Sequence, residues 1–215
     1  MKNTRWVFAS LLLLACNNVA VAQTKKPSSA VLVVQSAIPA AQEPTDKGAA
    51  TLDAQREKHA LQVFLKLGQT IIVSTADVMP ADKYGFAPTD GDFKGVRTFG
   101  QQVKHLAAAN HILAAAALGE EPPAGAGDEI GPETVRTKAE ILDYLKESFE
   151  HLARATEAIG DKNATVKSSP ISPLKGTETT RIALTVEAMI HAFDHYGQMV
   201  EYLRMNGVVP PASRP

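Results

Sequence analysis

Four stretches of the chain carry apolar residues at intervals of three and four, and this repetition limits the fold more than any other feature. The stretches cover residues 51–78, about 93 or 94 to 118, 137–160 and 177–206. Intervals of three and four place apolar side chains along one face of an α-helix. Connectors rich in proline and glycine separate the stretches, and no alternating strand pattern is evident. The sequence therefore predicts an all-α four-helix bundle.

Local end signals support the third and fourth helices. Thr137 and Glu140 have the Thr-x-x-Glu spacing of a capping box, in which each side chain accepts a hydrogen bond from an otherwise unpaired backbone N–H. Gly160 and Gly207 stand where glycine commonly ends a helix. These residues predict helix boundaries close to positions 137, 160 and 207.

The first 22 residues have the composition of a signal peptide. Lys2 and Arg5 precede an apolar run at residues 6–15, which is too short to cross a bilayer. The Ala-Val-Ala sequence at residues 20–22 has the spacing of a cleavage site. Cleavage after Ala22 would change the net charge from −1 to −3, because it removes two basic residues and no acidic residue. We expect an exported protein, periplasmic or secreted, with no transmembrane span after cleavage.

Cys16, the only cysteine, supports an alternative in which the protein is an anchored lipoprotein. The preceding Leu-Leu-Ala sequence is similar to a bacterial lipobox, in which the cysteine is lipidated and becomes the N-terminus. Leucine directly before the alanine departs from the usual lipobox, so the Ala-Val-Ala site favours soluble export. In that case the mature chain has no cysteine, and hence no disulfide and no thiol nucleophile.

Residues 23–48 are expected to form a flexible linker before the bundle. Their composition is dominated by Lys, Pro, Ser, Ala, Gln and Thr, and prolines at positions 27, 39 and 44 interrupt any regular element. The apolar patch at residues 30–34 is alternatively a strand or a segment that packs on the bundle. We expect the bundle itself to span residues 49–211.

The balance of charge argues against a nucleic-acid partner. The chain contains 22 Lys and Arg residues and 23 Asp and Glu residues, with both signs mixed along the sequence. A nucleic-acid-binding surface normally requires a basic patch, and none is present. The 45% content of apolar residues is enough to build a packed core.

Two of the six histidines have the spacing of a metal-binding pair. His191 and His195 are four residues apart on the fourth predicted helix, so their side chains lie one above the other. Two imidazoles at this spacing can hold one metal ion, as they do in His-Glu-x-x-His helices. The glutamate of that motif is absent here, which argues against a zinc protease. The alternative is a pair of packed histidines without metal.

His105 is the best candidate for a third ligand. It lies midway along the second predicted helix, within an apolar stretch. His111 is six residues further on and faces another direction, so we do not expect it to share the site. His59 and His151 have charged neighbours, which predicts ordinary solvated positions for both.

Several segments together resemble the DinB-like superfamily of metal-binding four-helix bundles. The sequence Met-Pro-Ala-Asp-Lys-Tyr-Gly-Phe-Ala-Pro stands at residues 79–88, and Val-Arg-Thr-Phe-Gly at residues 96–100 leads to His105. The His-x3-His pair is followed by Tyr-Gly-Gln at residues 196–198, and residues 202–211 contain Tyr-Leu-Arg, a glycine and a Pro-Pro pair. These segments occur in the order and approximate spacing of that family.

The resemblance implies that His105, His191 and His195 bind one divalent metal ion, most often zinc or nickel. It also implies a metal-dependent transferase that uses a small thiol, or a hydrolase, acting on a small molecule. The alternative is a non-catalytic metal-binding or stress-associated bundle that works through a partner or as a homodimer. The family usually has a basic residue after the last histidine, where this chain has Tyr196, so that position offers no charged contact to a substrate.

Two further residues could line or support the site. Glu187 lies one turn before His191, and Gln198 lies one turn after His195. Each could orient an imidazole, as residues around metal ligands commonly do. The alternative for Glu187 is a solvated helix face. Asp194 is expected to point elsewhere on the helix.

Overall fold

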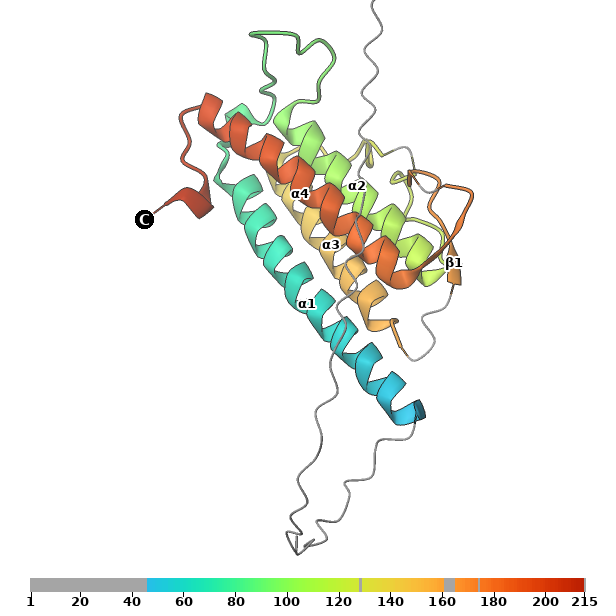
Figure 1. Ribbon diagram of the computed structural model, residues 1–215. Coiled ribbons are helices and arrows are strands. Elements are labelled where there is room, and N and C mark those ends of the chain that lie inside the picture. Colours follow the sequence, from blue (N-terminus) through green and yellow to red (C-terminus); the bar gives the residue numbers. More distant parts are fainter. Residues whose placement is uncertain (1–45, 128, 161–164, 174, 215) are drawn as a thin grey trace, which may run out of the picture. The chain divides into compact units, whose positions relative to one another are not determined.

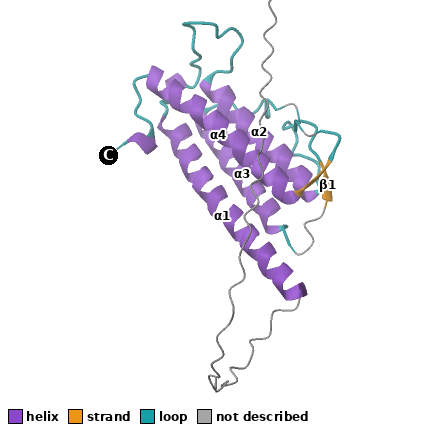
Figure 2. Ribbon diagram, viewed as in Figure 1, coloured by secondary structure: helices purple, strands orange, loops and turns teal. Residues whose placement is uncertain are grey.

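Four α-helices build the structure, as the periodicity predicts (Figures 1 and 2). They are α1 (Asp46–Val78), α2 (Phe99–Leu118), α3 (Lys138–Glu157) and α4 (Arg181–Met205). The remaining elements are short: the 3-10 helices η1 (Ala81–Lys83) and η2 (Pro211–Ser213) and the strands β1 (Thr165–Lys167) and β2 (Glu178–Thr180). The all-α four-helix bundle is thus confirmed.

The computed structural model describes residues 46–127, 129–160, 165–173 and 175–214. The predicted signal peptide and residues 23–45 of the predicted linker lie outside this part of the chain. Helix α1 begins at Asp46, five residues before the expected start, and alanines at positions 49 and 50 favour helix there. None of the helices in the described ranges combines the length and the apolar character that a membrane crossing requires.

Helices α2 and α3 run in the same direction. Near the middle of the two helices, the Asn110 side chain donates to Ser148 Oγ at 3.1 Å, and one residue further on His111 contacts His151. The second contact lies later in the sequence than the first on both helices, which is the order expected of a parallel pair. The long connection at residues 119–137 returns the chain to the end of the bundle where α2 begins (Figure 1).

Helices α2 and α4 run in opposite directions. At one end Arg181 donates to the carbonyl of Ala117, and at the other end Gln102 donates to the carbonyl of His195. Contacts are extensive between α2 and both α3 and α4, and α1 packs on α3 and α4 on the other side of the bundle. Helix α2 is therefore enclosed by its neighbours, and most of its residues are buried, including a run of alanines that allows close helix approach.

The second helix starts later than its apolar pattern predicts. Thr98 is the N-cap, and the reciprocal hydrogen bonds of a capping box join Thr98 and Gln101. Gly95 has φ +81°, a left-handed conformation that cannot continue a helix. The prediction of a start at Phe93 or Lys94 was therefore wrong, because the apolar residues before the cap belong to a loop.

The third helix begins as predicted and ends two residues early. The capping box between Thr137 and Glu140 is present, and both Glu140 contacts to backbone N–H groups lower the pKa of its carboxyl group. The C-cap is Ala158, whose N–H donates to the carbonyl of Arg154. Gly160 lies beyond the end, so its expected role as the cap was wrong.

The fourth helix begins at Arg181 because the preceding residues form a strand instead. Strand β2 pairs antiparallel with β1, with Val166 opposite Thr179. Thr180 then acts as the N-cap and accepts a hydrogen bond from the N–H of Ala183. At the other end Gly207 has φ +70°, which confirms its predicted role in ending the helix.

Candidate metal centre

Three imidazoles meet between α2 and α4. His191 Nε2 lies 3.2 Å from His105 Nε2 and 3.1 Å from His195 Nε2. His105 and His195 are buried, and His191 is partly buried. All three side chains can offer a ligand atom to one ion, since these atoms lie within 4.8 Å of one another. The convergence expected for His105, His191 and His195 is present.

The separations between the nitrogens suit a metal ion. Tetrahedral zinc binds imidazole nitrogen at about 2.0–2.1 Å, which places two such nitrogens about 3.3 Å apart. The Nδ1 atoms of His191 and His195 are buried and have no hydrogen-bond partner among the described residues. The polar contacts of both rings are therefore made through Nε2, toward the centre of the trio.

The backbone of Glu129 sets the protonation of His105. His105 Nδ1 lies 2.8 Å from the carbonyl oxygen of Glu129, and a carbonyl can only accept a hydrogen bond. His105 therefore carries its proton on Nδ1, which leaves the Nε2 lone pair free for a metal ion. Glu129 is the only non-glycine residue with positive φ in the described ranges, at 63°. Its unusual backbone directs this carbonyl at the ring, and residue types alone did not point to it.

The surroundings keep all three imidazoles neutral, which is the form that binds metal. Burial lowers the pKa of His191 to about 4, and His105 adds to the effect because two protonated rings so close together would repel each other. Burial also lowers the pKa of His195 to about 3, with contributions from the other two histidines. The pKa of His105 is lowered by burial as well, although the hydrogen bond that its ring donates to the Glu129 carbonyl acts in the opposite direction. The site can therefore offer three neutral nitrogen ligands at pH 7.

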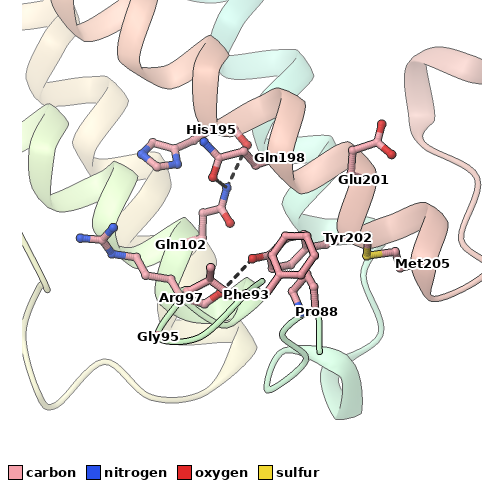
Figure 3. A pocket seen from close by; sticks show the side chains of 11 residues that line it. Pro88, Phe93, Gly95, Arg97, Gln102, His195, Gln198, Glu201, Tyr202 and Met205 are labelled. Carbon is pink, nitrogen blue, oxygen red and sulfur yellow. Dashed lines mark hydrogen bonds between the residues drawn. The ribbon is translucent and has the colours of Figure 1, made fainter. Parts of the chain in front are cut away.

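A cavity of about 440 Å³ opens beside His195 (Figure 3). Its wall includes Gln102 and Gln198, and Gln102 Nε2 donates to the carbonyl of His195 at 3.2 Å and to Gln198 Oε1 at 3.1 Å. Arg97 and Tyr202 also line it, and the Tyr202 hydroxyl donates to the Arg97 carbonyl. The volume is within the range of small-molecule sites.

The two supporting residues that the sequence suggested occupy different places. Gln198 lines the cavity and contacts Gln102. Glu187 accepts a hydrogen bond from Ser172 Oγ at 3.0 Å, and it forms no hydrogen bond or ion pair with an imidazole of the described residues. Asp194 accepts a hydrogen bond from Gln198 at 2.9 Å, and its charge raises the pKa of His191 slightly against the effect of burial.

The other histidines divide into one exposed residue and one buried pair. His59 is exposed, as predicted. His111 does not share the metal centre, which was also predicted, but it contacts His151 through the two Nδ1 atoms at 3.0 Å. His151 is only 5% exposed, so its predicted solvated position was wrong. Its charged sequence neighbours point outward from α3 while its ring packs against α2.

The buried pair predicts a pH-dependent loss of stability. Burial lowers the pKa of His111 in the folded protein to about 4, whereas the ordinary pKa of a histidine is 6.5. Between these two pH values the ring is protonated in the unfolded chain and neutral in the folded protein. The unfolded state then binds more protons, and stability falls as the pH decreases from 6.5 toward 4. We expect His111→Asn to remove about 3 kcal/mol of this pH dependence.

Urea unfolding at several pH values, with metal saturating throughout, measures this effect. His59→Asn is the matched control, because His59 is exposed and the substitution is the same. Equal pH profiles for the wild type and His111→Asn would show that folding does not lower the pKa of His111, contrary to the prediction.

The parallel α2 and α3 helices, the antiparallel α4 helix and the three converging imidazoles define a helical bundle that can hold a metal ion. A family model described as the DinB superfamily matches residues 65–199, more than half of the chain. This range contains the three candidate ligands, His105, His191 and His195. The chain belongs to the DinB superfamily. No curated protein matches it.

Proposed function

We propose that the protein is an exported metal-dependent enzyme, a hydrolase or a thiol transferase, that acts on a small molecule. One divalent ion, zinc or nickel, would be held by His105, His191 and His195. The observation that carries this proposal is the cavity that reaches His195 beside the trio. Structural zinc sites are usually closed by four protein ligands, whereas three ligands next to a cavity leave a position for chemistry.

The residues of the chain would prepare this position for a reactant. The Glu129 carbonyl holds His105 in the tautomer that presents Nε2 to the centre. The Gln102 side chain donates a hydrogen bond to the backbone carbonyl of His195. This bond fixes the turn of α4 that carries His195 against α2. When bound, a divalent ion would act as a Lewis acid and lower the pKa of a water molecule or thiol that reaches it.

The same cavity favours an enzyme over the alternative of a non-catalytic metal-binding bundle. A binder that acts through a partner needs no internal space beside its metal ligands. Export, which the first 22 residues suggest, favours hydrolysis over thiol transfer because small thiols are scarce outside the inner membrane. Water is available in every compartment, so a hydrolase needs no second substrate.

A comparison of ester hydrolysis and thiol transfer tests the proposal. The zinc- and nickel-loaded full chain would be incubated with p-nitrophenyl esters, and with electrophiles in the presence and absence of free cysteine. We expect turnover that requires metal and that is lost in His191→Ala. Equal turnover in the wild type and in His191→Ala would show that the activity does not depend on the three histidines. A metal-loaded wild type without turnover on any substrate would argue for the binding role instead.

A further inference from the structure

One positive charge on the cavity wall has no partner. Within the described ranges, the Arg97 guanidinium, which lines the cavity, makes no hydrogen bond and no ion pair. The acidic residue of the same wall, Glu201, is paired with Arg204 at 2.7 Å. The charge of Glu201 is therefore neutralised by Arg204, which does not line the cavity, whereas the charge of Arg97 is not neutralised.

The amide groups of the wall are already occupied. Gln102 Nε2 donates to Gln198 Oε1 and to the His195 carbonyl, and Gln198 Nε2 donates to Asp194 at 2.9 Å. These bonds use both amide N–H groups of Gln102 and one of the two of Gln198. The Arg97 guanidinium is thus the cationic donor of this wall that remains available to a ligand.

Arg97 lines the same cavity as His195. Its carbonyl oxygen accepts a hydrogen bond from the Tyr202 hydroxyl at 3.1 Å, and the next residue is the N-cap of α2. Its positive charge contributes to lowering the pKa of each of the three imidazoles. Figure 3 shows Arg97 and His195 bordering the same space.

The rest of the wall is apolar and exposed. Phe93, Val96 and Met205 line the cavity with exposures of 37%, 38% and 54%. Large apolar side chains that remain exposed around a concave surface gain free energy when an apolar ligand covers them. The cavity therefore offers one cationic group and several apolar ones.

We propose that this cavity binds a small organic anion, a carboxylate or a phosphate ester with an apolar body, and that Arg97 binds the anionic group. The planar guanidinium can donate two parallel hydrogen bonds to such a group. The apolar body would lie along Phe93, Val96 and Met205. This inference names the substrate class and rests on the proposed function for the place of the chemistry.

Isothermal titration of the zinc-loaded full chain with octanoate, octyl phosphate and octanol tests the inference. We expect both anions to bind more tightly than octanol. In Arg97→Gln, affinity for the anions should fall about tenfold, because a hydrogen bond to a charged group is lost. Octanol affinity and metal content should not change. Arg97→Lys keeps the charge but not the planar pair of donors, so its affinity for the anions should lie between those of the wild type and Arg97→Gln.

Lys94→Gln is the matched control. Lys94 is exposed in the same loop, does not line the cavity, and its replacement removes the same charge. If Lys94→Gln weakens octanoate as much as Arg97→Gln does, the effect is general electrostatics and the inference fails. It also fails if the metal-loaded wild type binds octanol as tightly as octanoate. If instead no metal binds but octanoate still depends on Arg97, the proposed function fails and the inference stands.

Discussion

Replacement of His195 with alanine is expected to lower the affinity for zinc or nickel by more than about a hundredfold, since even the loss of a residue that only supports a ligand costs tenfold to a hundredfold. His195 Nε2 lies 3.1 Å from His191 Nε2, and its removal leaves two imidazoles for the ion. With two imidazoles, two of the four tetrahedral positions are left to water instead of one. His105→Ala and His191→Ala should have effects of similar size.

Elemental analysis after dialysis, with far-UV circular dichroism to confirm the helices, measures this loss. His59→Ala is the matched control, because His59 is an exposed histidine on α1. It should retain the same metal content as the wild type. One ion per chain in His195→Ala, with the helices intact, would show that the ion binds elsewhere.

Replacement of Phe99 with alanine is expected to lower the free energy of unfolding by about 3–5 kcal/mol, the usual cost of truncating a fully buried aromatic residue. Phe99 is 0% exposed at the start of α2. Its ring packs edge-on against Tyr84 at 5.3 Å between centroids and lies 6.5 Å from Tyr202. The substitution removes these contacts and leaves a cavity where α2 begins.

Urea denaturation measures this change, and Phe64→Ala is its control. Phe64 is 58% exposed on α1, so the same truncation there should cost much less, within about 1 kcal/mol. Phe99 packs near Tyr202, whose hydroxyl donates a hydrogen bond to the Arg97 carbonyl. Phe99→Ala should therefore also disturb the position of Arg97 and weaken octanoate binding. Equal losses of stability in the two variants would contradict the core position of Phe99.

The existence and order of the helices could be predicted from sequence, but not all of their ends could be predicted. Apolar periodicity identified all four helices, and the capping box of Thr137 and Glu140 located the start of α3. The start of α2 was missed because Phe93 and Val96 continue the apolar pattern, although Gly95 already has a left-handed backbone. The strand before α4 was missed because three residues of pairing leave no periodic signal.

The candidate site was predictable where it depends on helix spacing and resemblance, and not where it depends on loops. His191 and His195 follow from their spacing on one helix, and His105 from its place in the second. Glu129 contributes through its backbone, which its residue type does not reveal. Arg97 and the buried position of His151 depend on how distant segments pack, and local sequence does not encode that packing.

X-ray absorption spectroscopy at the metal edge, on the full chain loaded with one equivalent of zinc or nickel, tests the metal centre most directly. We predict a first shell at about 2.0–2.1 Å for zinc, with the outer-shell scattering of three imidazoles. In His195→Ala that scattering should be weakened or absent. A spectrum with only oxygen ligands, or one unchanged by the substitution, would contradict a centre built from His105, His191 and His195.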